Sequence, residues 1–506
     1  MKFIRFRNPI AIAILIIMCS AACSHKKADK KPNIVFLFAD DQCYTTVHAL
    51  GNKEIITPTL DKLSQEGVTF THAYNMGAWN GAVCQASRAM LNTGRFVWRA
   101  YGYENHQEDL VQRGEMWGQL MQKAGYDTYM TGKWHVASDA YKLFNHVTHV
   151  RPGMPGDGWG RERHKGPFIK TANDSDGNSA DLTPVGYNRP LSPEDTTWQP
   201  WDKKFGGYWQ GGKHWTEVLG DDAIAFIDSA KTNDQPFFMY LAFNAPHDPR
   251  QSPKEFVDMY PLEHIAVPES FLPNYPYEDS IGCGPGLRDA ALAPFPRTAY
   301  AIKVHRQEYY AIITHLDQQI ARILKALEAT GEMDNTYIFY TADHGMAIGD
   351  HGLVGKQNMY DHSIRPPLFV LGPGVPKNKK IDVDVYLQDI MASTLDLAQF
   401  QKPEFIEFNS LMPFVRGEQT QSNYPAIYGC YIDLQRMVRK DGFKLIVYPH
   451  GKTMLLYDLT NDPLEMNDLA DKPEYQEKKK QLFDELLKLQ QEMDDPLDLT
   501  QVFMDI

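Results

Sequence analysis

The chain has 506 residues, of which 43% are hydrophobic and 23% are charged, and this balance excludes disordered, collagen-like and low-complexity proteins. The length fits two or three domains, or one large α/β domain with a smaller one. The 51 basic and 64 acidic residues give a net charge of −13, without the basic surplus that nucleic-acid binding requires, so we expect no nucleic-acid partner.

Residues 1–22 have the pattern of a signal peptide. A positively charged start precedes Ile10–Met18, an apolar run too short to span a bilayer, and small residues lead to Cys23. Small residues before a cysteine resemble the lipobox of bacterial lipoproteins. We therefore expect export to the periplasm or cell surface, with lipidation at Cys23 and residues 23–31 as a tether; simple cleavage is the alternative. Membrane contact is expected only through this anchor.

Four continuous apolar runs are typical of strands that are buried on both faces of a sheet. They are Asn33–Phe38, Tyr126–Met130, Pro236–Phe243 and Tyr337–Tyr340. Helical patterns lie between them, including a long one from about Val304 to Thr330. This alternation predicts an α/β fold with a large, doubly wound and mostly parallel sheet.

Each of these four runs is followed by ionisable side chains. In chain order they are Asp40 and Asp41, Lys133 and His135, His247, and Asp343 with His344. In doubly wound sheets, ligands bind beyond the carboxyl ends of the strands, so we expect these groups to meet in one site. The alternative for any one of them is an ordinary polar turn.

The segment Cys84–Arg95 has the pattern of a helix that begins near Cys84 and ends at Gly94. A helix N-terminus presents free amide groups that favour an anion. Arg88 lies four residues further on, which places it on the same helix face as Cys84. The alternative is that Cys84 is a buried structural residue.

The same segment resembles the signature of the sulfatases of the alkaline phosphatase superfamily: Cys, any residue, Pro or Ala, any residue, Arg, and a later Gly-Arg. The resemblance implies that Cys84 is oxidised to formylglycine (3-oxoalanine), whose hydrate is the nucleophile. Ala86 stands where Pro is more frequent, and this variant resembles substrates of the oxygen-independent radical maturase. A maturase of this type is therefore the expected partner.

The resemblance also implies a set of site residues. The implied metal ligands are Asp40, Asp41, Cys84, Asp343 and His344, with His344 standing where Asn is common. Their carboxylates suit Ca²⁺ or Mg²⁺, and the imidazole also admits Mn²⁺; the resemblance implies Ca²⁺. The implied catalytic residues are Cys84, Arg88, Lys133, His135, His247 and Lys356. In this scheme one diol oxygen attacks sulfur, His247 or Lys356 protonates the leaving alcohol, and His135 takes the proton from the second diol hydroxyl.

An insertion from about Asn145 to Trp215 bears on the substrate, because it is rich in Gly, Pro, Trp and Tyr. Its basic residues are Arg151, Arg161, Arg163, His164, Lys165, Lys213 and His214. Such loops either cover the surface or line a carbohydrate site. Together with export, this favours a sulfated glycan as substrate, and His214, Asp248 and Arg250 are candidate sugar contacts.

The expected reaction is therefore the hydrolysis of a sulfate ester on a carbohydrate. Two alternatives stay open. A phosphonate or phosphate ester hydrolase of the same superfamily could use the same nucleophile and metal, and a sulfated-glycan-binding protein could have lost catalysis.

The resemblance divides the folded chain into a catalytic domain at residues 32–415 and a smaller C-terminal α+β domain at residues 416–506. In the smaller domain, Phe443–Tyr448 and Leu456–Glu465 resemble strands of a four-stranded antiparallel sheet. A terminal helix is expected around Tyr475–Glu492.

Overall fold

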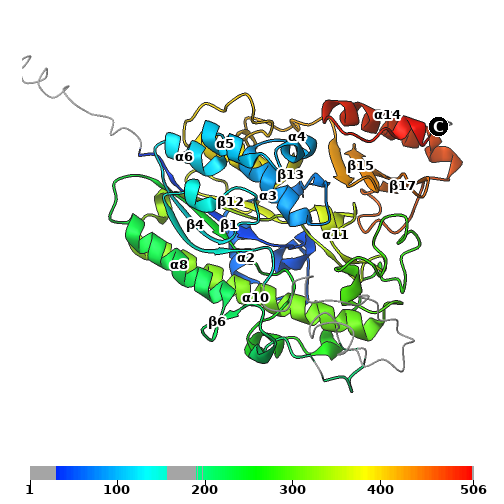
Figure 1. The fold of residues 1–506 in the computed structure, drawn as a ribbon, viewed down its shortest axis with the longest axis horizontal. Coiled ribbons are helices and arrows are strands. Elements are labelled where there is room, and N and C mark those ends of the chain that lie inside the picture. The colour runs from blue at the N-terminus through cyan, green and yellow to red at the C-terminus, as the bar shows by residue number, and fades with distance from the viewer. Residues whose placement is uncertain (1–29, 156–189, 191, 197, 504–506) are drawn as a thin grey trace, which may run out of the picture.

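The structure is a computed structural model that describes residues 30–155, 190, 192–196 and 198–503 (Figure 1). The predicted signal peptide, Cys23 and the basic residues at positions 161 and 163–165 lie outside the described residues. Among the helices of the described part, none is both long and apolar enough to cross a bilayer. At the end of the predicted tether, the Lys30 ammonium lies 3.1 Å from the Glu332 carboxylate.

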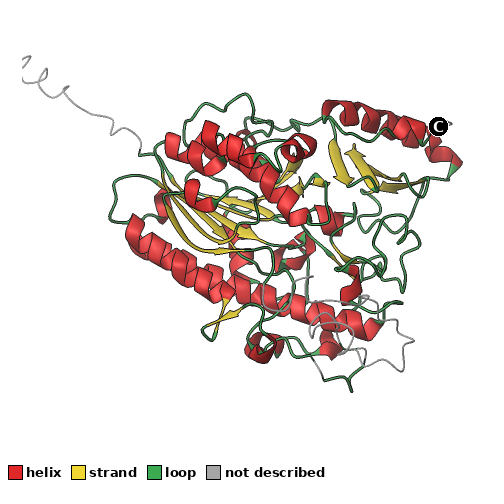
Figure 2. Cartoon of the chain, in the orientation of Figure 1, coloured by secondary structure: helices red, strands yellow, loops and turns green. Residues whose placement is uncertain are grey.

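A mixed sheet of eight strands in the order β13-β2-β12-β9-β1-β8-β4-β5 forms the centre of the larger part (Figure 2). Its strands are β1 (Asn33–Ala39), β2 (Val68–Tyr74), β4 (Asp127–Lys133), β5 (His146–Arg151), β8 (Phe237–Ala242), β9 (Thr336–Ala342), β12 (Leu368–Leu371) and β13 (Lys379–Tyr386). The neighbouring strands β9, β1, β8, β4 and β5 are parallel, whereas β12 is antiparallel to β9 and β2. The predicted mostly parallel sheet is confirmed, and the four predicted strands are at its centre.

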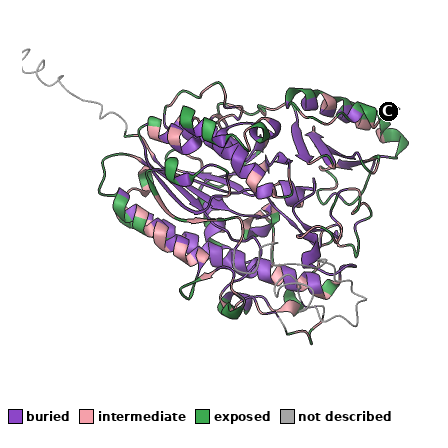
Figure 3. Ribbon diagram, viewed as in Figure 1, coloured by how far each residue is buried: buried purple, intermediate pink, exposed green. Residues whose placement is uncertain are grey.

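The strand β1 is apolar at nearly every position because helices cover both faces of the sheet (Figure 3). One face packs against α6 (Trp117–Lys123) and α12 (Asp389–Leu397). The other packs against α2 (Pro58–Glu66), α8 (Trp215–Ala230) and α10 (Ala299–Thr330). Each large apolar side chain buried in this way contributes about 2 kcal/mol to stability. The sheet is therefore a rigid platform for the loops at its carboxyl edge.

The predicted long helix begins earlier than expected, at Ala299, because the Thr298 hydroxyl oxygen accepts a hydrogen bond from the Ala301 amide at 3.2 Å. Shorter elements connect the main ones. They are α4 (Val97–Gly102), α5 (Gln107–Arg113), α9 (Lys254–Val257), α11 (Asp361–Ile364), α13 (Met412–Arg416), and the paired strands β6 (Trp209–Gln210) with β7 (Lys213–His214) and β10 (Ala347–Ile348) with β11 (Val354–Gly355).

A second sheet lies near the C-terminus and contains the four antiparallel strands that the resemblance implies, of which sequence analysis located two. They are β14 (Ile427–Tyr431), β15 (Gln435–Lys440), β16 (Phe443–Tyr448) and β17 (Thr453–Asp458), and α14 (Gln476–Glu492) packs against them. A fifth short strand, β3 (Gly77–Ala78), pairs parallel to β14 and was not predicted. At Gly77 a Cβ atom would overlap the carbonyl oxygen of Cys430, and φ is +92°, so this pairing requires glycine.

The helix α3 (Val83–Thr93) follows β3 closely and carries Cys84 as its second residue. Apolar side chains of α3 share one core with the C-terminal sheet. The smaller sheet therefore helps to hold the helix that presents Cys84 to the carboxyl edge of the larger sheet.

Candidate functional site

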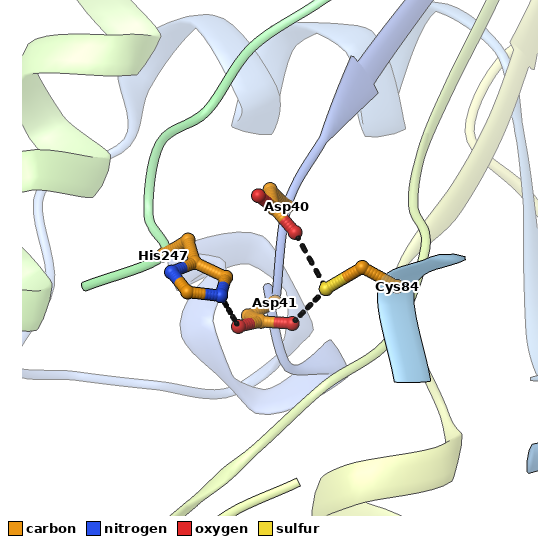
Figure 4. A group of neighbouring side chains, drawn as sticks. All are labelled: Asp40, Asp41, Cys84 and His247. Carbon is orange, nitrogen blue, oxygen red and sulfur yellow. Dashed lines mark hydrogen bonds and ion pairs between the residues drawn. The ribbon is translucent and has the colours of Figure 1, made fainter. Parts of the chain in front are cut away.

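The carboxyl ends of the central strands and the N-terminus of α3 meet at one point (Figure 4). Asp40 and Asp41 follow β1, His247 lies beyond the end of β8, and Cys84 faces them from α3. One potential ligand atom from each of these four buried residues lies within 4.8 Å of all the others. The Cys84 thiol donates to Asp40 Oδ1 at 3.1 Å and to Asp41 Oδ1 at 3.3 Å. The structure thus brings these strand ends together with Cys84, as the topology predicts.

Asp343 and Arg88 form a buried layer beneath this group. Asp343 Oδ1 accepts from the Asp41 amide at 3.1 Å, and Oδ2 accepts from Arg88 Nε at 2.8 Å. Arg88 also donates to the Lys133 carbonyl oxygen at 2.8 Å. Arg88 is one of the implied catalytic residues, and its side chain has no exposed surface. Its bonds fix the Asp343 carboxylate and the end of β4.

Two lysines place positive charge at the site. The Lys133 ammonium is paired with Asp40, and Lys356 Nζ lies 2.8 and 2.7 Å from the two Asp41 oxygens and 2.7 Å from Cys84 Sγ. Burial alone would lower the pKa of Lys356, but Asp41 and other acidic neighbours raise that pKa well above its usual value. Lys356 therefore stays an ammonium ion next to the sulfur of Cys84.

His135 and His247 are both neutral in this environment. Burial, followed by the charges of Lys133 and other cations, lowers the pKa of His135 to about 2. Burial, followed by the charge of Lys356, also holds the pKa of His247 well below its usual value. His247 Nδ1 lies 2.7 Å from the Asp248 carbonyl oxygen, which only accepts, so Nδ1 carries the proton and Nε2 has the free lone pair.

The thiol of Cys84 is a poor nucleophile as it stands. Burial, with further contributions from Asp343 and Asp40, raises the pKa of the Cys84 thiol well above its usual value. The thiolate is the reactive form of cysteine, and this environment suppresses it. An unmodified Cys84 would therefore attack an ester slowly at neutral pH.

The carboxylates of the site fit a divalent cation. Burial, and next the Asp343 carboxylate, raise the pKa of Asp40 to about 8. In addition, His344 Nε2 is buried without a hydrogen-bond partner, while its Nδ1 lies 2.9 Å from the Gly345 carbonyl oxygen. Carboxylate oxygens with an imidazole nitrogen suit Ca²⁺, Mg²⁺ or Mn²⁺.

The closest group of potential ligands differs from the predicted one. It contains His247, which sequence reasoning placed among the catalytic residues, and it does not contain Asp343 or His344. Asp343 is held by Arg88, and His344 is turned by its contact with Gly345, so neither reaches as far into the group in this conformation.

A cavity of about 550 Å³ opens beside Cys84. The described residues that line it are Asn80, Gly81, Ala82, Cys84, His135, Gly153, Met154, His247, Leu287, Arg288, Asp289, Lys356 and Gln357. Sequence reasoning missed Asn80, Arg288, Asp289 and Gln357. The first three lie in loops that follow no predicted strand, and the one signal in the sequence was that Gln357 directly follows Lys356, an implied catalytic residue.

The three predicted sugar contacts do not line this cavity. His214 Nδ1 accepts from the Thr216 amide at 3.2 Å and so caps α8. Arg250 is completely buried and bonded to His305. Asp248 is also buried, where it forms an ion pair with Arg288. His214 and Arg250 thus have structural contacts and Asp248 lies behind the cavity wall, and sugar binding by these residues stays a prediction.

Replacing Gly132 by alanine is expected to destabilise the protein by about 3 kcal/mol. Gly132 precedes Lys133 in β4 and has a φ of +95°, and a Cβ atom would overlap the Ala242 carbonyl oxygen of β8. Gly125 is the matched control, because its φ is +89° and no atom lies within 4 Å of its Cβ position, so Gly125→Ala should cost only about 1 kcal/mol. Chemical denaturation measures both, and equal losses would contradict the role of the β8 contact.

Comparisons with known proteins agree with this arrangement. A family model described as Sulfatase matches residues 32–400, and one described as N-sulphoglucosamine sulphohydrolase, C-terminal, matches residues 349–492. An arylsulfatase of Clostridium perfringens is 28% identical, covering 88% of this chain and 92% of that protein. An N-acetylglucosamine-6-O-sulfatase of Bacteroides thetaiotaomicron is 26% identical, covering 96% of this chain and 92% of that protein.

Solved structures share the fold. One, determined in complex with its substrate D-glucosamine-2-N,6-O-disulfate, has a TM-score of 0.66 at 22% identity and covers 92% of this chain and 99% of its own. A phosphonate monoester hydrolase of Agrobacterium radiobacter has a TM-score of 0.65 at 21% identity and covers 93% of this chain and 97% of its own.

Proposed function

The chain belongs to the sulfatase family, whose model covers residues 32–400, and on this premise we propose that it removes sulfate from a sulfated carbohydrate through a nucleophile made from Cys84. The observation that carries the proposal is the cavity that ends at Cys84, with Lys356 and His247 beside it. The carbohydrate class is supported by relatives that act on sulfated amino sugars.

The proposed nucleophile is formylglycine at position 84, produced by a maturase of the radical type that accepts Ala86. When present, its hydrate supplies an oxygen nucleophile in place of the thiol, whose raised pKa makes it unreactive. Lys356 Nζ lies 2.7 Å from the sulfur at this position, so its charge is close to where negative charge develops.

The proposed cofactor is Ca²⁺, with Mg²⁺ or Mn²⁺ as alternatives. Its proposed ligands are Asp40, Asp41, Asp343, His344 and the side chain of residue 84. When bound, such a cation polarises a sulfate oxygen and favours the ionised nucleophile. The fit rests on the three buried carboxylates and on the unpartnered Nε2 of His344.

Adding Ca²⁺ to metal-free protein is accordingly expected to raise the melting temperature of the protein, and the rise should grow with the concentration of free Ca²⁺. A free ion at 100 times its dissociation constant stabilises the folded state by about 2.7 kcal/mol. Asp40→Asn should lose this shift, whereas Asp228→Asn, at an exposed position on α8, should keep it. Differential scanning calorimetry measures the shift without any turnover. An unchanged shift in Asp40→Asn would contradict the ligand assignment.

The neutral and charged side chains take different roles in the proposed proton transfers. Lys356, an ammonium ion beside residue 84, gives a proton to the leaving alcohol. His135, which lines the cavity, accepts the proton of the second hydroxyl at position 84. His247 binds and orients the ester from the cavity wall, and Lys133 and Arg88 act through Asp40 and Asp343 as positioning residues.

The function is tested by measuring sulfate release from sugars sulfated at single defined positions. The protein must first be shown by mass spectrometry to carry the aldehyde at residue 84. Matched phosphate and phosphonate esters are the comparison. A higher kcat/KM on the phosphorus esters would favour the phosphohydrolase alternative, and binding of sulfated sugars without sulfate release would favour a binding protein.

We also propose that the mature chain begins at a lipidated Cys23 and is exported to the periplasm or cell surface. In this proposal residues 32–415 form the catalytic domain and residues 416–506 the smaller domain. Support comes from the lipobox-like pattern of the N-terminus and from the antiparallel sheet that begins with β14.

A further inference from the structure

One wall of the cavity beside Cys84 carries an arginine and a carboxylate side by side. These residues, Arg288 and Asp289, belong to the loop that precedes α10, and their side chains are 15% and 5% exposed. They form an ion pair with each other. Neither takes part in the proposed chemistry, yet both face the space that the leaving group would occupy.

The wall is held in place from two sides. Behind it, both Arg288 Nη atoms contact the Asp248 carboxylate, and the Nη2 to Oδ1 distance is 3.4 Å. Beside it, Asp289 Oδ2 accepts from Gln357 Nε2 at 2.7 Å, and Gln357 Oε1 accepts from the Lys356 amide at 3.0 Å. The donors and acceptors of this wall are therefore fixed relative to Lys356 before any ligand binds.

The charge of Arg288 is already balanced within the wall. The buried Asp248 carboxylate lies against the Arg288 guanidinium as an ion pair. Two carboxylates, Asp248 and Asp289, thus surround one guanidinium. At the Arg288 guanidinium a second anion on the substrate would meet these two carboxylates, while the Lys356 ammonium of the same cavity is already paired with Asp41.

Hydroxyl groups match this wall better than anions do. A guanidinium is a fixed donor, a carboxylate is an acceptor, and a hydroxyl group both donates and accepts. Adjacent hydroxyl groups on a sugar ring can bond to both partners at once. The combination of fixed geometry, balanced charge and paired donor and acceptor is what an uncharged sugar ring requires.

We propose that Arg288 and Asp289 bind hydroxyl groups of the sugar that carries the ester and select sugars without a second anionic group at this wall. This inference rests on the proposed sulfatase function. It assigns the substrate to the class of monosulfated, otherwise neutral sugars, and it makes Arg288 and Asp289 specificity-determining residues.

The test uses matured full-length protein and pairs of sugars that share one sulfate ester, one partner carrying an additional sulfate. Galactose monosulfates with their disulfates are such pairs, and in N-acetylglucosamine 6-sulfate with D-glucosamine-2-N,6-O-disulfate the second sulfate replaces the N-acetyl group. For every monosulfate that is hydrolysed, we expect a kcat/KM at least about tenfold above that of its disulfated partner. Asp289→Asn, which removes one charge but keeps the shape, should reduce this ratio at least about fivefold.

The matched control is Asp228→Asn, which removes the same charge from a side chain that is 60% exposed on α8 and should leave the ratio unchanged. Equal kcat/KM values for the two sugars of a pair, or a preference for the disulfate, would overturn the inference. Because this ratio is measured on the wild-type protein, the test does not depend on whether a variant folds. An unchanged ratio in folded Asp289→Asn would overturn it as well. If protein that carries the aldehyde releases no sulfate from any sugar, the proposed function fails and the inference falls with it.

Discussion

Replacing Cys84 by alanine is expected to reduce sulfate release by about 10⁴-fold or more, because it removes the side chain from which the proposed nucleophile is made. The loss should appear in kcat, since the cavity walls that bind the sugar stay in place. The thiol is neutral and makes only side-chain contacts, with Asp40, Asp41 and Lys356, so the melting temperature should change by only a few degrees. Ion chromatography of released sulfate and calorimetry of the same samples measure both effects.

Cys430→Ala is the matched control for this experiment. Cys430 is also completely buried, but it lies in β14 and does not line the cavity. This variant should lose about 1 kcal/mol of stability and keep its turnover. Full activity in Cys84→Ala, or an intact thiol at residue 84 throughout an active preparation, would contradict the proposed nucleophile.

The fold could be predicted because its central strands are buried on both faces. A continuous apolar run such as Asn33–Phe38 indicates a buried strand when it is short and helical patterns lie on either side of it along the chain. The strand β3 could not be predicted, since two residues show no periodicity. Its place depends on a contact with Cys430, more than 350 residues further along the chain.

The candidate site could be predicted only in outline. Topology alone brings the strand ends to one edge, and helix geometry places Cys84 at an N-terminus. Sequence does not determine which way each side chain turns after its strand ends. Arg88 turns beneath the site to Asp343, and His344 is turned by its contact with Gly345.

The residues of the cavity wall were missed for a different reason. Arg288 and Asp289 lie in a loop between helices, where a charged pair usually lies on the surface. Their significance comes from the tertiary contacts with Asp248 and Gln357. Binding residues in such loops can be recognised only when a structure shows their tertiary contacts.

Replacing Lys356 by alanine is expected to lower kcat on sugar sulfates by about 10²- to 10³-fold. Lys356 is the ammonium group next to Cys84 Sγ, whereas His247 is neutral and its Nδ1 proton is directed to the Asp248 carbonyl oxygen. If Lys356 delivers the proton to the leaving oxygen, its loss should matter most for weakly acidic alcohols such as sugars. On 4-nitrophenyl sulfate, whose leaving phenolate needs little protonation, the loss should be at least about tenfold smaller.

His247→Gln serves as the comparison, because a neutral residue that only binds the ester should affect both classes of substrate alike. Steady-state kinetics on one sugar sulfate and one aryl sulfate, for both variants, separates the two roles. Equal losses for Lys356→Ala on the two substrates would mean that Lys356 stabilises charge on the sulfate group without protonating the leaving oxygen. A larger loss for His247→Gln on the sugar than on the aryl ester would move the proton donor to His247 and show that its pKa rises when substrate binds.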